Sequence, residues 1–197
     1  MLEVELKSVV DDVPLRRAAI ESAGAVLTFE GRLADRRYDM LDGSLVARDH
    51  VLRVRGYGSQ AGARAELGWK GPTGREGGYK VREELEVSVD DSTAIAAILE
   101  RLGFRVTVAT DREIAQYDLH GAMVRFETYP RMDQLVEVEG SPDRIERAIA
   151  ALGLPRVGFT AEPLTEFVRR FQARTGLPAA LSDAELHDIS APTVHGA

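Results

Sequence analysis

The sequence contains no cysteine among its 197 residues, which excludes disulfide bonds, thiolate catalysis and cysteine-ligated metals. Its four histidines have no metal-ligand spacing, so we expect them to have surface or packing roles. They are His50, His120, His187 and His195. No Ser-His-Asp arrangement stands out, and no apolar run reaches the length of a membrane span. These absences argue against covalent catalysis and against a membrane helix.

An excess of basic residues is also absent, because the formal net charge is −7. Broad binding to nucleic acid or to anionic membranes needs a basic surface, so we expect neither partner, although a local basic cluster could still bind an anion. The chain is 44% hydrophobic and 29% charged, which suits one domain with an appendage. The first residues already alternate like a strand and no signal peptide is apparent, so we expect a cytoplasmic protein.

Helix start and stop signals predict four helices, near residues 13–23, 92–102, 142–152 and 162–174. Asp11 or Asp12 would cap the first and Asp91 the second, while Ser141 precedes a proline at the start of the third. A glycine follows each helix. These are Gly24, Gly103, Gly153 and Gly176. Alternating residues predict strands near 2–9, 35–41, 50–57, 63–71, 79–89, 104–109, 112–119, 122–128 and 134–139. We therefore expect a domain over residues 1–178 and a loose tail over 179–197.

The predicted strands share an unusual feature, in that one face of nearly every strand is charged. The residues on these faces are Glu3, Glu5, Lys7, Arg53, Arg55, Glu66, Lys70, Lys80, Arg82, Glu84, Glu86, Arg125, Glu127, Glu137 and Glu139. For a single strand, a solvated outer face is the usual explanation. A closed barrel with the charged face inward is the alternative, and about eight strands leave room for one small ligand. The scarcity of uncharged polar residues on these faces favours the barrel.

The charged residues also suggest a ligand. Pairs of acids two residues apart place two carboxylates side by side, and a divalent cation such as Mg²⁺ relieves their repulsion. Arginine and lysine pairs bind phosphate oxygens. An interior that holds both sets suits a metal-chelated polyphosphate, whose chemistry depends on positioning and charge neutralisation.

Several segments resemble, in order, the CYTH superfamily of class IV adenylyl cyclases and thiamine triphosphatases, also called triphosphate tunnel metalloenzymes. They are Glu3-Val4-Glu5-Leu6-Lys7, Arg37-Tyr38-Asp39, Leu52-Arg53-Val54-Arg55, Trp69-Lys70-Gly71-Pro72, Lys80-Val81-Arg82-Glu83-Glu84-Leu85-Glu86, Arg112 and Leu135-Val136-Glu137-Val138-Glu139. The resemblance covers about residues 1–175. It implies an α+β fold in which a closed eight-stranded antiparallel barrel, the tunnel, is flanked by about four helices.

The resemblance also implies roles for these residues, with Mg²⁺ or Mn²⁺ as cofactor. The metal ligands would be Glu3, Glu5, Glu127, Glu137 and Glu139, with Glu84 and Glu86 as further candidates. The substrate-binding set would be Lys7, Arg53, Arg55, Lys70, Lys80, Arg82, Arg112 and Arg125, of which Lys7, Lys70 and Arg112 are also the catalytic candidates. Two positions depart from the family pattern. Thr110 stands where a lysine is frequent, and Glu127 stands where an aspartate is usual.

Three functions follow as expectations. The first is an adenylyl cyclase that converts ATP to cyclic AMP and pyrophosphate. The second is a hydrolase of inorganic triphosphate, thiamine triphosphate or a nucleoside triphosphate, and the third is a non-catalytic nucleotide- or polyphosphate-binding module. In each case the partner is a small-molecule triphosphate. The sequence does not decide whether the chain forms a homodimer. Because neighbouring carboxylates repel, we expect that removing Glu5 or Glu137 removes most turnover, leaves the fold intact and does not much lower the stability of the metal-free protein.

Overall fold

The structure, a computed structural model, describes residues 2–190, and for Leu2, Glu3 and Ser190 it describes the backbone alone. The strands are β1 (Leu2–Val9), β2 (Val26–Asp39), β3 (Val51–Ser59), β4 (Gly62–Lys70), β5 (Gly74–Glu76), β6 (Tyr79–Val89), β7 (Arg105–Leu119), β8 (Ala122–Thr128) and β9 (Leu135–Glu139). The helices are α1 (Val13–Ser22), α2 (Ser92–Arg101), α3 (Pro142–Leu152), α4 (Leu164–Thr175) and α5 (Asp183–Ser190), with short 3-10 turns at Val46–Arg48 and Arg156–Gly158.

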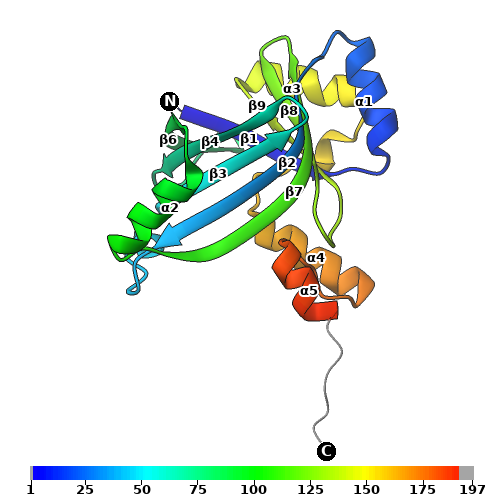
Figure 1. Cartoon of the computed structure of the whole chain (residues 1–197). Coiled ribbons are helices and arrows are strands. Elements are labelled where there is room, and N and C mark those ends of the chain that lie inside the picture. The colour runs from blue at the N-terminus through cyan, green and yellow to red at the C-terminus, as the bar shows by residue number, and fades with distance from the viewer. Residues whose placement is uncertain (1, 191–197) are drawn as a thin grey trace, which may run out of the picture.

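Eight of the strands close into an antiparallel barrel. Their order is β1-β9-β8-β7-β2-β3-β4-β6, and pairing of β1 with β6 joins the two ends. The one strand of the sheet that is not part of the barrel, β5, pairs with the beginning of β6. Closure leaves the two barrel edges paired with each other, which removes the exposed strand edges of an open sheet. The predicted α+β barrel is confirmed (Figure 1).

The largest hydrophobic core lies outside the barrel wall, beneath α1 and α3. Leu6, Val124 and Val138 point outward from their strands, and Ile145 of α3 and Ile20 of α1 cover them. All five side chains are almost completely buried. The two helices lie together on one side of the barrel in Figure 1. Because alternate residues of a strand face opposite sides, this packing sends the charged residues of the same strands inward.

Smaller cores hold the other helices in place. The side chain of Asp91 caps α2 by accepting hydrogen bonds from the amides of Thr93 and Ala94, both at 2.9 Å. Leu99 of that helix then packs on outward residues of the barrel wall. At another end of the barrel, Phe167 of α4 packs against Tyr129 and Leu135 in a separate cluster.

Two strands are longer than the sequence pattern predicted. β2 begins at Val26 instead of near residue 35, and β7 is continuous where we expected a break at 110–111. A register shift between Leu27 and Phe29 interrupts the alternation of β2, which hid its first half. Asp111 resembled a turn residue, but it points outward from β7 and bonds Arg36 at 2.7 Å.

The segment that we expected to be a loose tail is attached to the barrel as far as the structure describes it. Ala180 forms a backbone bridge with Arg131, and the amide of Asp111 donates to the carbonyl of Leu181 at 2.7 Å. Helix α5 follows, lying beside α4 in Figure 1. The remaining part of that segment, 191–197, and with it His195, lies outside the described residues. Within residues 2–190, no helix is long and apolar enough to cross a membrane.

Candidate functional site

The interior of the barrel is lined by charged side chains that are paired with one another. Arg53 is only 4% exposed and Glu127 only 1% exposed, which are low values for ionised residues. Such burial is tolerated when each charge has an opposite partner and hydrogen bonds. We call this interior the tunnel, and its charges fall into two main groups.

The first group lies on β3, β4 and β6. The guanidinium of Arg53 forms an ion pair with Glu84 and donates to Glu86 Oε1 at 2.7 Å. Lys70 Nζ lies 3.2 Å from Glu84. The Arg55 guanidinium lies 3.5 Å from Glu86. Glu84 and Glu86, which we considered as metal ligands, therefore face the arginines that we expect to bind phosphate.

A glycine explains how Arg53 fits. Gly68 lies opposite Arg53 across β3 and β4, where the alternation would place a tunnel side chain. A Cβ atom at Gly68 would lie 3.3 Å from Arg53 Nε and 3.4 Å from Glu86 Oε1. The missing side chain leaves the space in which Arg53 reaches the two glutamates of β6.

The second group lies on β1, β7, β8 and β9. Lys7 Nζ lies 2.7 Å from Glu137 and 3.5 Å from Glu127, and Arg112 Nε lies 3.0 Å from the other Glu127 oxygen. The Tyr129 hydroxyl donates to Glu127 at 2.7 Å. Burial lowers the pKa of Lys7, but Glu127 and Glu137 more than offset this and hold that pKa above its usual range. In the metal-free protein these carboxylates thus hold Lys7 as a cation.

The carboxylates of this group are held ionised. Burial raises the pKa of Glu137, but Lys7 and Arg125 outweigh it and bring that pKa well below its usual value. Burial likewise raises the pKa of Glu127, and Arg112 and Lys7 lower it overall. The pKa of Tyr129 is raised by burial and by Glu127, so its hydroxyl remains a donor.

Three other predicted residues have different surroundings. Lys80 forms an ion pair with Glu5 across β1 and β6. Arg125 donates to the side chain of Gln116 at 2.9 and 3.1 Å and lies 3.5 Å from Glu137. Arg82 bonds backbone instead, donating to the carbonyl of Gly71 at 2.7 Å and to that of Asp49 at 2.6 Å. Arg82 thus connects the loop that follows β4 with the loop that precedes β3. Its role in substrate binding stays a prediction.

Asp35 and Arg37 of β2 also face the tunnel, and the sequence pattern did not identify them. Asp35 is 3% exposed, and one of its oxygens accepts from Arg55 Nε at 3.1 Å. Burial raises its pKa, but Arg55 and Arg53 bring it well below the usual value. Strand pairing places Arg37 opposite Arg53. Both lie in the segment 35–41 that we predicted as a strand, but with Arg36 they form three consecutive charges, so no alternation marked their face, although the motif Arg37-Tyr38-Asp39 was a signal within reach.

One end of the tunnel is apolar. Leu33, Tyr57 and Ile114 are buried against each other there, with Phe29 packed on them. The Arg64 guanidinium lies over the Tyr57 ring at 3.8 Å from its centre and forms an ion pair with Glu66. This cluster lines its end of the tunnel, and the charged part of the interior begins beyond it.

The donor chemistry of the tunnel suits a hard divalent cation. Pairing of β1 with β9 places Glu5 opposite Glu139 and Lys7 opposite Glu137. The Glu127 oxygen that lies 3.0 Å from Arg112 Nε accepts no hydrogen bond, so its ion pair with Arg112 is what a metal would have to replace. Among the described side chains, which do not include Glu3, no three carboxylate or histidine groups are already gathered as a metal site. Carboxylate oxygens of the right kind are thus present, and gathering them requires some to leave their cationic partners.

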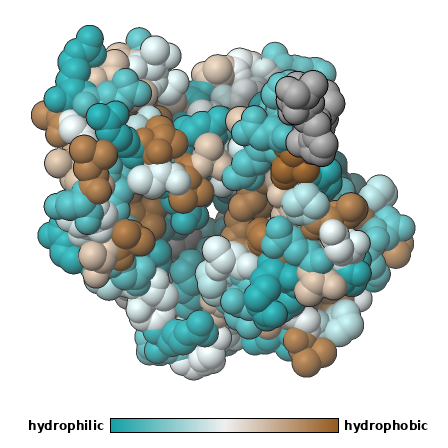
Figure 2. Space-filling view, turned by 90° about the horizontal axis from the view of Figure 1, so that it is seen from below, coloured by the Kyte–Doolittle hydropathy of each residue, from teal (hydrophilic) through white to brown (hydrophobic). Residues whose placement is uncertain are grey.

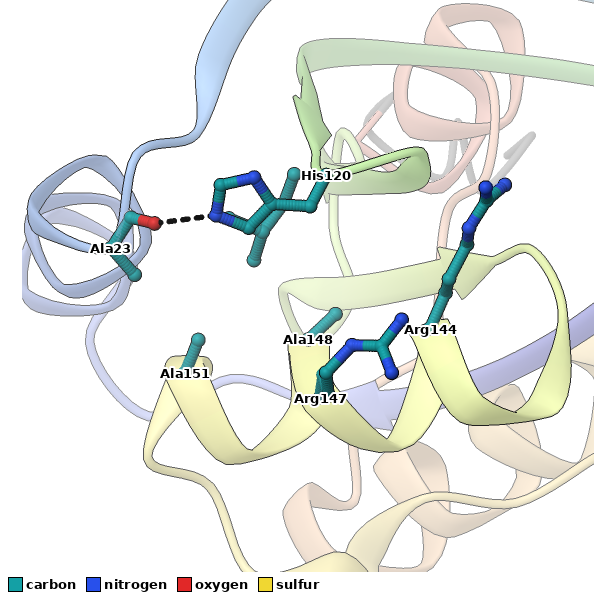
Figure 3. A pocket seen from close by; sticks show the side chains of 7 residues that line it. Ala23, His120, Arg144, Arg147, Ala148 and Ala151 are labelled. Atoms are coloured by element: carbon teal, nitrogen blue, oxygen red, sulfur yellow. Dashed lines mark hydrogen bonds between the residues drawn. The ribbon is translucent and has the colours of Figure 1, made fainter.

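A small cavity outside the tunnel is lined in part by a histidine. It measures about 60 Å³ and is lined by Ala23, Leu119, His120, Arg144, Arg147, Ala148 and Ala151. His120 Nε2 hydrogen-bonds the Ala23 carbonyl at 3.0 Å, which ties the β7–β8 turn to α1 (Figure 3). The guanidinium groups of Arg144 and Arg147 do not face a common point in that view. This geometry supports the expected packing role of His120.

The molecule is also hollowed at the centre of one face. Seen from below, hydrophobic and hydrophilic residues both border this hollow (Figure 2). Solvent therefore reaches between the parts of the molecule that flank it.

Comparison with known proteins now decides the family. The profile of the CYTH domain matches residues 1–139, which is more than two thirds of the chain. The chain belongs to the CYTH family. CYTH proteins form a metal-dependent triphosphate tunnel family, and CYTH enzymes are adenylyl cyclase-like or triphosphatases. No curated protein sequence matches the chain significantly.

Solved structures agree in fold. A candidate adenylate cyclase from Vibrio parahaemolyticus aligns with a TM-score of 0.72 at 17% identity, over 86% of this chain and 98% of its own. The protein PH1819 from Pyrococcus horikoshii aligns with a TM-score of 0.68 at 20% identity, over 85% and 98%. The candidate adenylyl cyclase HpAC1 from Hippeastrum, described as having a dominant triphosphatase activity, aligns at 0.59 and 18% identity, over 90% and 97%. At these identities the likeness concerns the fold of the CYTH protein alone.

Proposed function

We propose that this CYTH protein is a metal-dependent enzyme that binds a triphosphate in its tunnel and cleaves it by hydrolysis. The observation that carries the proposal is the convergence of buried arginines from both groups of tunnel charges. Arg53, Arg55 and Arg112 all influence Asp35, whose pKa they depress. A polyanion that enters this region would meet several fixed guanidinium groups, which bind phosphate oxygens in bidentate geometry.

The ligand would replace the carboxylates that now hold these cations. Glu86 is the most accessible of them, with a side chain 36% exposed, and it can turn toward solvent when phosphate oxygens bind Arg53. Buried N–H groups of Arg53 and Arg112 lack hydrogen-bond acceptors, and phosphate oxygens would supply them. The exchange of carboxylate for phosphate keeps the arginines neutralised in both states.

The metal would bind on the opposite wall. Glu5, Glu137 and Glu139 are the residues that we expect to hold Mg²⁺ or Mn²⁺, together with Glu3 and Glu127. A divalent cation there neutralises charge on the phosphates and acts as a Lewis acid. Lys7, which stays protonated, would remain beside Glu137 and supply a further positive charge to the phosphate chain.

Hydrolysis fits the charged interior better than a reaction that must hold a purine. Tunnel residues with large apolar surfaces, Leu33, Tyr57 and Ile114, are buried against each other and offer no stacking face. In the proposed reaction, water attacks the terminal phosphorus, the bond to the bridging oxygen breaks, and the shortened phosphate leaves. The buried cations would stabilise the negative charge that develops on the leaving oxygen.

Cyclisation of ATP is the second candidate, and one observation favours it. Val106 and Val108 at the beginning of β7 are 44% and 41% exposed, so a nucleoside could rest on them at the tunnel end. Cyclisation needs no water-activating group, since the ribose 3′-hydroxyl attacks the α-phosphorus and pyrophosphate leaves. His50 packs against Trp69, His120 bonds the Ala23 carbonyl and His187 lies in α5, so none of these histidines is placed as a base, which is compatible with this reaction.

Product analysis tests the proposal. The purified protein is incubated with inorganic triphosphate or with ATP, each in Mg²⁺, in Mn²⁺ and in EDTA, and the products are separated by chromatography. We expect orthophosphate and pyrophosphate from inorganic triphosphate, and no turnover in EDTA. Arg53→Ala should raise KM and lower kcat, whereas Arg169→Ala on the exposed face of α4 should change neither. Cyclic AMP as the main product from ATP would favour the second candidate, and no turnover of either compound would refute catalysis.

A further inference from the structure

Arg37 stands apart from the other tunnel cations because no carboxylate holds it. Among the residues that the structure describes, its guanidinium forms no ion pair and no hydrogen bond. Its neighbours are cations on two adjacent strands, with Arg53 opposite it on β3 and Arg112 farther along β7. A cation that lies beside other cations and has no carboxylate partner is a position where an anionic ligand adds an ion pair.

The position of Arg37 is known from strand geometry. Exposure rises along the tunnel face of β2, from Leu33 at 0% through Asp35 at 3% to Arg37, which is exposed. Its other strand neighbour, Val108 of β7, is 41% exposed. Arg37 therefore lies at the end of the tunnel that is opposite to the apolar cluster, where water can enter.

The electrostatics of Arg37 agree with this placement. Partial burial lowers its pKa, Asp35 raises it, and Arg53, Arg112 and Arg55 lower it again. The single carboxylate of Asp35 is already bonded by Arg55. Thr110, which pairs with Asp35 from β7, is neutral and adds no charge to this wall. The four guanidinium groups thus form a positive region that is not fully compensated by the protein.

We propose that Arg37 is a specificity-determining residue through which the tunnel distinguishes a triphosphate from a diphosphate. This inference rests on the proposed function. The buried cations Arg53, Arg55 and Arg112 can be satisfied by a short phosphate chain. A longer chain reaches toward the open end, where Arg37 binds the additional phosphate. Opposite residues of paired strands lie only about 5 Å apart, so Arg37 and Arg53 are close enough to bind successive groups of one chain.

The test compares two ligands by calorimetry in Mg²⁺, the non-hydrolysable imido analogue of inorganic triphosphate and pyrophosphate. For Arg37→Met, the Kd of the triphosphate analogue should rise about 10- to 100-fold, as expected for the loss of a hydrogen-bonded charge contact. The Kd of pyrophosphate should change little. Arg37→Lys should recover part of the loss, because a lysine keeps the charge but not the planar geometry.

Controls separate the possible failures. Arg101→Met removes the same charge from the outer surface of α2 and should leave both Kd values unchanged, which excludes a general effect of net charge. Because Arg37 has no partner, Arg37→Met should also melt at the wild-type temperature. Unchanged binding of the triphosphate analogue by Arg37→Met, or equal weakening of both ligands, would overturn the role of Arg37. If the wild-type protein binds the analogue but turns over no triphosphate, the proposed function fails while the role of Arg37 is still decided.

Discussion

Replacing Glu137 by glutamine should destabilise the protein even before any ligand binds. Glu137 is 6% exposed and contacts Lys7 at 2.7 Å and Arg125 at 3.5 Å. The variant keeps the shape of the side chain but removes the charge, so two cations lose a buried partner. Removing one member of a buried ion pair costs about 3–5 kcal/mol.

The structure points to the lower end of that range. Lys7 keeps Glu127 at 3.5 Å, and Arg125 keeps its hydrogen bonds to Gln116. We therefore expect a loss of about 3 kcal/mol in the free energy of unfolding. For a chain of this size the corresponding fall in Tm is about 6–12 °C.

Urea unfolding and thermal melts of the metal-free protein measure this effect. Glu113→Gln provides the matched control, because Glu113 lies on the outer face of β7, with a side chain 62% exposed, and its ion pair with Arg32 spans 3.6 Å. A surface pair of this kind contributes about 0–1 kcal/mol. Equal midpoints for wild type and Glu137→Gln would show that the tunnel carboxylates repel each other, as their spacing in the sequence alone suggested, and that their pairing with cations is energetically unimportant.

Other expected outcomes concern neighbouring features. Tyr129→Phe removes the donor at 2.7 Å from Glu127 and should lower the free energy of unfolding by about 1–3 kcal/mol in urea titrations, whereas an unchanged midpoint would mean that water replaces the hydroxyl. Asp111→Asn weakens the side-chain contacts of Asp111 with Arg36 and with the amide of Asp183, so trypsin should cleave at Arg174 faster while triphosphate turnover stays the same; cleavage at the wild-type rate would contradict this anchoring. Burial raises the pKa of Glu86, but Arg53 lowers it to about 2 from its usual 4.5, so the stability that Glu86 contributes should be complete above pH 4.5 and be lost as the pH falls toward 2. Melts of wild type and Glu86→Gln across this range should converge at low pH, and parallel curves would exclude the ion pair as the cause.

Local sequence pattern was sufficient for much of the fold. Helix caps such as Asp91 and stop glycines such as Gly153 act within a few residues, and the predicted helices begin and end close to where the structure has them. The inward charge of the strands was also predictable, because it follows from a period of two along each strand. The first half of β2 was missed because a register shift after Leu27 breaks that period.

The ion pairs inside the tunnel could not be predicted in the same way, because the partner of each charged residue depends on strand order and register. Arg53 meets Glu84 and Glu86, which are more than 30 residues away in the sequence, because β4 pairs with β3 on one side and with β6 on the other. Asp35, Arg36 and Arg37 are three consecutive charged residues, so their sequence does not show which of them face the tunnel. In the structure Arg36 points outward and bonds Asp111, whereas Asp35 and Arg37 face inward.

The same pairing changes the interpretation of the acids. Side by side in the sequence, the glutamates suggested mutual repulsion that only a metal could relieve. In the structure the tunnel carboxylates Glu5, Asp35, Glu84, Glu86, Glu127 and Glu137 each form an ion pair with a lysine or arginine. Glu86 lies where a phosphate oxygen is expected to bind Arg53. The carboxylates therefore keep the arginines ordered and neutralised before the ligand arrives. Binding then exchanges one set of ion pairs for another, so the arginines reach the bound state without first being buried as uncompensated charges. Arg37, which has no such partner, is the position where the ligand adds an ion pair instead of replacing one.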